Sequence, residues 1–120
     1  IMANVGSITM DGDSTITNSV ALTHGAAMYL YGATANVLDS VISNNEATWQ
    51  GVVYINSTST VNFENVIAEN NKTNQGGVFC LCDNPTVTLD NVTAKNNAAK
   101  AEGGAIYHYA WGGKLSILDC

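Results

Sequence analysis

The sequence predicts an all-β, single-domain parallel β-helix of about four to five coils, with roughly 26 residues in each coil. Asparagine pairs recur at Asn44-Asn45, Asn70-Asn71 and Asn96-Asn97, and a glycine follows each pair by six or seven residues. The stretches between these marks are short and rich in β-branched residues, which is typical of strands joined by turns. No apolar 3.6-residue period is long enough to indicate a helix.

The recurring marks divide the chain into coils at about residues 8–35, 36–60, 61–86 and 87–114, with partial coils at both ends. The first of these copies is the weakest, and the other three are clear. Because both ends of the chain fall inside a repeat, residues 1–120 are expected to be a β-helix fragment of a longer repeat protein.

The repeated asparagines and glycines are interpreted as structural. Asn45, Asn71 and Asn97 are expected to superpose in successive coils, where each side-chain amide bonds to the asparagine of the next coil. The recurring glycines are expected to permit positive φ or close packing at a turn. They are Gly51, Gly77 and Gly104.

Columns of like residues are predicted to build the interior and the surface. Leu38, Phe63, Leu89 and Ile117 recur at intervals of 25, 26 and 28 residues and are expected to stack as a core column. Beside them an outward acidic column is expected from Asp39, Glu64 and Asp90. A solvated stripe is the interpretation we favour for this column, and a bridging Ca²⁺ ion is the alternative.

The strand after each turn glycine supplies the candidate contact surface. The third residue after each turn glycine is expected to point outward, which gives an apolar, tyrosine-rich column. Its members are Met28, Tyr54, Cys80 and Tyr107, with Tyr109 beside it. Such a patch is what a partner-binding surface requires. The reverse parity would place the same residues in the core.

Cysteines and sequons give weaker expectations. Cys80 and Cys82 lie on one face of one strand with Cα atoms near the limit of about 7 Å for a disulfide, and Cys120 lies about two coils away. We therefore expect no bond among the three. Asn56 and Asn91 are the plausible glycosylation acceptors.

Composition excludes several functions. The chain has 4 lysines, no arginine and 10 acidic residues, which give a net charge of −6. A nucleic-acid or anionic-membrane partner needs a basic patch, so neither is expected. No apolar run is long enough for membrane insertion. No cofactor or metal is expected, and without arginine or a paired-carboxylate motif we expect no enzyme.

The tetrapeptide Gly103-Gly104-Ala105-Ile106 and the partial copy Gly76-Gly77-Val78-Phe79 alternate with asparagine units that end at Asn71 and Asn97. This phased pattern resembles the GGA[ILV] and FxxN repeats of the chlamydial polymorphic outer membrane protein family, although alanine stands where that family has phenylalanine. The resemblance implies a surface-exposed, right-handed β-helix, and parallel crossovers have the same general handedness.

These observations predict a non-catalytic, secreted or cell-surface structural protein, namely a β-helical stalk or a fibre-forming or adhesin segment. Its expected partners are other protein chains, through self-association or on a host surface, or glycans. One alternative is a carbohydrate-binding or carbohydrate-cleaving β-helix whose active coils lie outside residues 1–120. Another is an interaction module that binds its partner on the face of Tyr54 and Tyr107.

Overall fold

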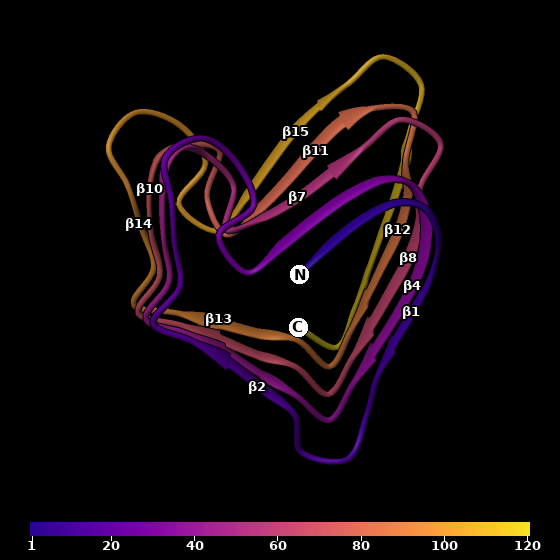
Figure 1. The fold of residues 1–120 in the computed structure, drawn as a ribbon, viewed down its shortest axis with the longest axis horizontal. Coiled ribbons are helices and arrows are strands. Elements are labelled where there is room, and N and C mark those ends of the chain that lie inside the picture. The colour runs from indigo at the N-terminus through magenta and orange to yellow at the C-terminus, as the bar shows by residue number, and fades with distance from the viewer.

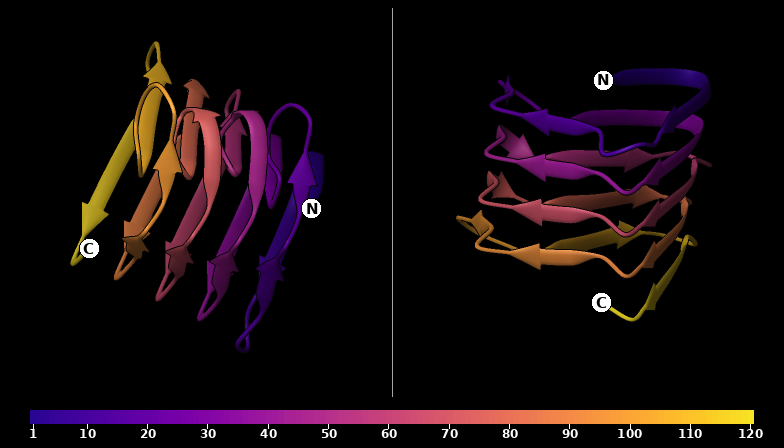
Figure 2. Two further views of the ribbon diagram at one scale, coloured as in Figure 1. Left: turned by 90° about the vertical axis from the view of Figure 1, so that its left-hand side faces the viewer. Right: turned by 90° about the horizontal axis from the view of Figure 1, so that it is seen from below.

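A computed structural model describes the backbone of residues 1–120 and every side chain except that of Ala110. The chain contains sixteen strands. The part that the structure describes has no helix. The strands stack in parallel as a β-solenoid of about 26 residues per turn, which confirms the predicted fold class. Seen from the N-terminal end, the chain runs clockwise as it recedes (Figures 1 and 2), so the coil is right-handed.

Four walls surround the interior (Figure 1). The first two belong to one eight-stranded sheet, and β1 (Met2–Met10) and β4 (Met28–Leu38) run through both of them. The first wall continues with β7 (Val53–Asn56), β11 (Phe79–Asp83) and β15 (Ile106–Ala110), and the second with β8 (Thr60–Glu64), β12 (Thr86–Asp90) and β16 (Lys114–Leu118). The third wall holds β2 (Thr15–Thr17), β5 (Val41–Ser43), β9 (Ile67–Glu69) and β13 (Thr93–Lys95), and the fourth β3 (Val20–Ala21), β6 (Glu46–Gln50), β10 (Lys72–Gln75) and β14 (Ala98–Ala99).

The corner between the third and fourth walls holds the predicted asparagine ladder. Asn45 Nδ2 donates to Asn71 Oδ1 at 3.1 Å, and Asn71 Nδ2 donates to Asn97 Oδ1 at the same distance. Asn71 Oδ1 also accepts a hydrogen bond from the backbone N–H of Asn45 at 3.0 Å, and Asn97 Oδ1 accepts one from the backbone N–H of Asn71 at 2.9 Å. These contacts satisfy buried backbone groups at a turn and hold neighbouring coils in register.

The corner between the second and third walls corrects the predicted register of one coil. Asp39 takes the left-handed conformation there at φ 46°, as Asn65 does at φ 55° in the next coil. Val37 therefore pairs with Phe63, so Leu38 does not belong to the core column. The predicted column counted 25 residues from Leu38 to Phe63, whereas the paired residues Val37 and Phe63 are 26 apart. The left-handed corner is formed by an aspartate in this coil and by an asparagine in the next.

The interior is apolar and continuous through the coils. Phe63 and Phe79 meet edge to face with ring centroids 5.0 Å apart, and Leu30, Ile55 and Leu81 are fully buried beside them. Packing of this kind stabilises a solenoid through its nearest-neighbour coils.

Two residues predicted for other roles lie elsewhere. Met28 pairs with Val53 and is 0 % exposed in the core, so its assignment to the outward column was wrong. The first coil holds one more residue between its glycine and the strand than the second coil does, and Tyr29 takes the outward position. Gly104 has open space around it and no positive φ, whereas Gly103 has φ 63°. Gly103 therefore has the turn role in that coil, while Gly51 and Gly77 keep the role predicted for them, at φ 49° and 50°.

Candidate functional site

The outer face of the first wall carries an aromatic column. Tyr29 pairs with Tyr54, Tyr54 with Cys80 and Cys80 with Tyr107, so these four residues stack along the axis of the coil. We call them, together with His24 and with Trp49 of β6, the aromatic strip. The outward parity of Tyr54, Cys80 and Tyr107 is as predicted, because they pack in a cluster separate from the core.

Two members of the strip are less accessible than predicted. Tyr54 is 8 % exposed and Cys80 is fully buried, because the loops that follow the fourth wall fold against the strands. A Cβ added at Gly51 would lie 2.5 Å from Cys80 Cβ, and the ring of His24 packs 4.6 Å from that of Tyr54. Sequence alternation gives the side of the sheet but not the position of these loops, so this cover was not foreseen.

The aromatic rings stack mainly on one another. The rings of Tyr29 and Tyr54 have centroids 5.3 Å apart and planes 21° apart, and those of His24 and Trp49 are 6.0 Å and 16° apart. Trp49 Nε1 also donates to Gln75 Oε1 at 3.2 Å. Each of these stacking contacts occupies one face of the two rings that it joins.

Exposed aromatic residues flank the strip. Trp49, on β6 of the fourth wall, is 55 % exposed. Tyr31 on β4 and Tyr109 on β15 are exposed on the first wall, Tyr109 at 56 %. Tyr107 and Tyr109 have nearly parallel rings 6.2 Å apart. The second wall differs, since its outward positions carry threonine and asparagine, as at Asn62 and Thr88. The exposed aromatic side chains therefore lie on the first wall, on the adjoining strand β6 and, with Trp111 at 84 % exposure, in the segment that follows β15.

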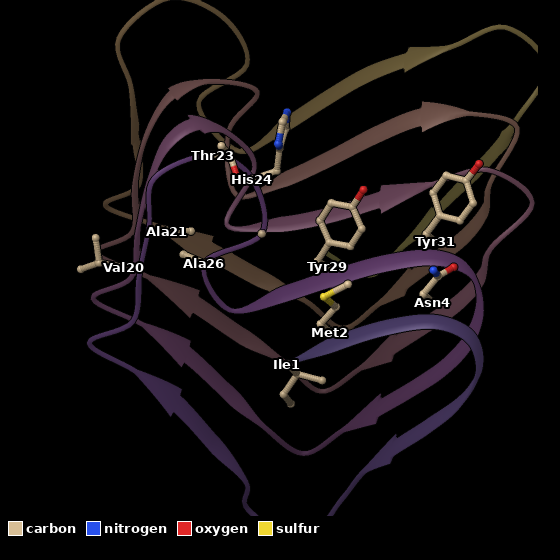
Figure 3. Close-up of a pocket in the computed structure, with 11 residues that line it drawn as sticks. Ile1, Met2, Asn4, Val20, Ala21, Thr23, His24, Ala26, Tyr29 and Tyr31 are labelled. Atoms are coloured by element: carbon tan, nitrogen blue, oxygen red, sulfur yellow. The ribbon is translucent and has the colours of Figure 1, made fainter.

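A cavity of about 630 Å³ lies at the N-terminal end of the strip. Its lining comes from three parts of the first coils, namely β1, the segment around His24 and the strand that carries Tyr29 and Tyr31. Figure 3 shows Tyr29, Tyr31 and His24 directed to the same side of the ribbon. The strip thus ends in a recess with mixed aromatic, aliphatic and amide character.

Two neighbouring thiols lie on this face, Cys80 in the strip and Cys82 two residues further along β11. Cys80 Sγ and Cys82 Sγ are 3.7 Å apart. All three cysteines are free, and no bond joins any two of them. The hydrogen bond from the Cys80 thiol lowers the pKa of Cys82 to about 7, and the Tyr54 hydroxyl acts in the same direction against the effect of burial. The same thiol–thiol bond, together with burial, raises the pKa of Cys80. Burial is the main cause that raises the pKa of Tyr54.

The acidic column predicted as a weak calcium candidate has only two aligned members. Glu64 pairs with Asp90, but Leu38 and not Asp39 is the partner of Glu64 in the preceding coil. Asp39 Oδ1 instead accepts a 2.8 Å hydrogen bond from Asn65 Nδ2 at the corner. Within the described residues, no group of three or more His, Cys, Asp or Glu side chains is placed to hold a metal ion.

The two predicted glycosylation acceptors already use their amide nitrogens. Asn56 Nδ2 donates to the Tyr54 hydroxyl at 3.1 Å, and Asn91 Nδ2 donates to Asn65 Oδ1 at 2.8 Å. Asn91 is exposed at a turn and Asn56 is half-buried. An N-glycosylated amide keeps one N–H, so a glycan on either residue is compatible with the hydrogen bond that its nitrogen donates. Glycosylation of both residues stays a prediction.

Comparison with known proteins finds no matching family model, no similar curated protein and no similar solved structure. The residues that the structure describes include no helix that is long and apolar enough to cross a membrane.

Proposed function

We propose that this chain is a non-catalytic segment of a secreted or surface-displayed β-helical protein, an adhesive stalk that binds another protein chain through the aromatic strip and its flanking residues. The observation that carries the proposal is the exposure of Trp49, Tyr31 and Tyr109, which flank that strip on its two sides. Tyrosine and tryptophan are enriched at protein interfaces, where they supply large contact areas at small entropic cost.

The orientation of the rings favours a protein over a glycan as the partner. A sugar that stacks on an aromatic side chain needs a free ring face, and the contacts of Tyr29 with Tyr54 and of His24 with Trp49 each occupy one face of these rings. The tyrosine hydroxyl groups, ring edges and exposed apolar areas beside them are available for contact. These groups suit the mixed polar and apolar surface of a protein partner.

Surface display is supported by the repeat pattern. The Gly103-Gly104-Ala105-Ile106 unit and the recurring asparagines resemble repeats of the polymorphic outer membrane protein family, whose β-helices face the cell exterior. The acidic composition, with a net charge of −6, also favours a solvated surface over contact with nucleic acid or anionic lipid.

The proposal is tested by binding of the labelled chain to arrays of extracellular proteins and of glycans. Trp49→Ala combined with Tyr109→Ala should weaken protein binding at least tenfold and leave the circular dichroism spectrum unchanged, because both side chains are exposed. The matched control is Ile67→Ala, which removes a partly exposed apolar side chain from the third wall and should leave binding unchanged.

Two outcomes would contradict the proposal. Equal loss of binding in the Ile67→Ala control would show that apolar exposure in general, and not the aromatic strip, causes adhesion. Binding to glycans alone, lost in the Trp49/Tyr109 variant, would replace the protein partner by a carbohydrate.

A further inference from the structure

The thiols of Cys80 and Cys82 lie side by side on the outer face of β11, at the floor of the aromatic strip. We propose that they form a two-thiolate binding site for a soft, tetrahedral divalent metal ion of the Zn²⁺ and Cd²⁺ class. The remaining coordination positions would be taken by water or by a ligand from outside the chain. This site is independent of the proposed adhesive function.

The spacing of the sulfur atoms suits such an ion. Zinc binds thiolate at about 2.3 Å in a tetrahedral arrangement. Two sulfur atoms 3.7 Å apart can both lie at that distance from one ion with an S–metal–S angle of about 107°, close to the tetrahedral value. Soft thiolate ligands select zinc and similar ions over calcium or magnesium. The pair therefore needs little rearrangement to act as a chelate.

The strand that carries the thiols is held on both sides. β11 pairs with β7 through Phe79–Leu81 and with β15 through Phe79–Asp83. Residues two apart in such a strand have Cα atoms separated by about 6.6 Å, at the upper end of the range that disulfides span. Because neighbouring ladders prevent the strand from contracting, a disulfide between Cys80 and Cys82 would be strained. The arrangement thus favours a reduced pair that is available to a metal ion.

Charge balance also favours metal binding. A coordinated ion would displace the proton of Cys80, since metal-bound thiols are deprotonated. Two thiolates balance the charge of a divalent ion, which lowers the cost of holding it in a largely buried position.

The experiment is titration of the reduced protein with Co²⁺ and Cd²⁺ under anaerobic conditions. We expect one ion per chain, a tetrahedral cobalt spectrum and a thiolate-to-cadmium charge-transfer band. Cys80→Ser and Cys82→Ser should each weaken binding at least tenfold. The matched control, Cys120→Ser, removes the exposed cysteine at the end of the chain and should bind as the parent does.

If either serine variant fails to fold, protection from alkylation is measured in the unmodified protein by mass spectrometry. Bound Cd²⁺ should slow alkylation of Cys82 at least tenfold and leave Cys120 unaffected. The proposal is overturned by an octahedral cobalt spectrum, by binding that persists without Cys80 or Cys82, or by equal protection of Cys120. Rapid oxidation of the pair to a disulfide with no metal binding would overturn it as well.

Discussion

Replacing Asn71 by leucine should remove the central contact of the asparagine ladder. The change deletes four hydrogen bonds, with Nδ2 donating to Ile42 O and Asn97 Oδ1, and with Oδ1 accepting from the backbone N–H and the side-chain amide of Asn45. Among the described hydrogen bonds, the Asn45 N–H has no other acceptor, and Asn45 is 1 % exposed.

The cost follows from those contacts. An orphaned buried N–H costs about 1 to 3 kcal/mol, and each of the other lost bonds about 0.5 to 1.5 kcal/mol. Since leucine recovers part of this by burial of its apolar side chain, we expect Asn71→Leu to lower the free energy of unfolding by about 3 to 5 kcal/mol. A folded chain of this length has a total free energy of unfolding of about 6 to 18 kcal/mol.

The measurement is urea unfolding followed by circular dichroism, with Asn62→Leu as the control. Asn62 lies on the second wall, and its side chain makes none of the described hydrogen bonds, so the control should change stability by less than about 0.5 kcal/mol. If Asn71→Leu also changed stability by less than that amount, the ladder would not hold the coils together, and the physical account of the repeat would be wrong.

Two further predictions concern stability. Gly103→Ala should lower it by more than about 1 kcal/mol, because φ is 63° and the new Cβ would approach the Ile106 carbonyl oxygen at 2.6 Å. Gly104→Ala meets no atom within 4 Å and should be neutral or slightly stabilising; equal thermal melting of the two variants would contradict this. Thr73→Val should raise stability by about 1 kcal/mol, since Thr73 Oγ1 is buried without a partner in the described structure. A lower melting temperature for Thr73→Val would show that the hydroxyl has a partner, such as a water molecule.

The sequence predicted what depends on repetition. The constant spacing of the asparagines predicted the coil length and the ladder, because stacked parallel strands place residues one period apart in contact. Alternation also gave the correct side of the sheet for Tyr54 and Cys80, and the spacing of the cysteines indicated that they would not pair.

What the sequence did not predict depends on which residue occupies a corner and on how loops pack. Aspartate occupies a left-handed corner at Asp39 where the next coil has Asn65, so the residue pattern alone placed Leu38 one position away from its true register. An extra residue before β4 moved Met28 into the core. The cover over Cys80 comes from loops whose path is set by glycine conformation and tertiary contact, which no residue period encodes.

The hydrogen bonds of the asparagine ladder run along the axis of the solenoid, as do those between its parallel strands. A pulling force along this axis would load the bonds of one coil boundary together, whereas a force that peels the chain from one end would break them one after another. We therefore expect the molecule to be mechanically anisotropic, stiff under axial tension and weak to peeling. For a stalk, the position at which the load enters the chain would then determine its strength.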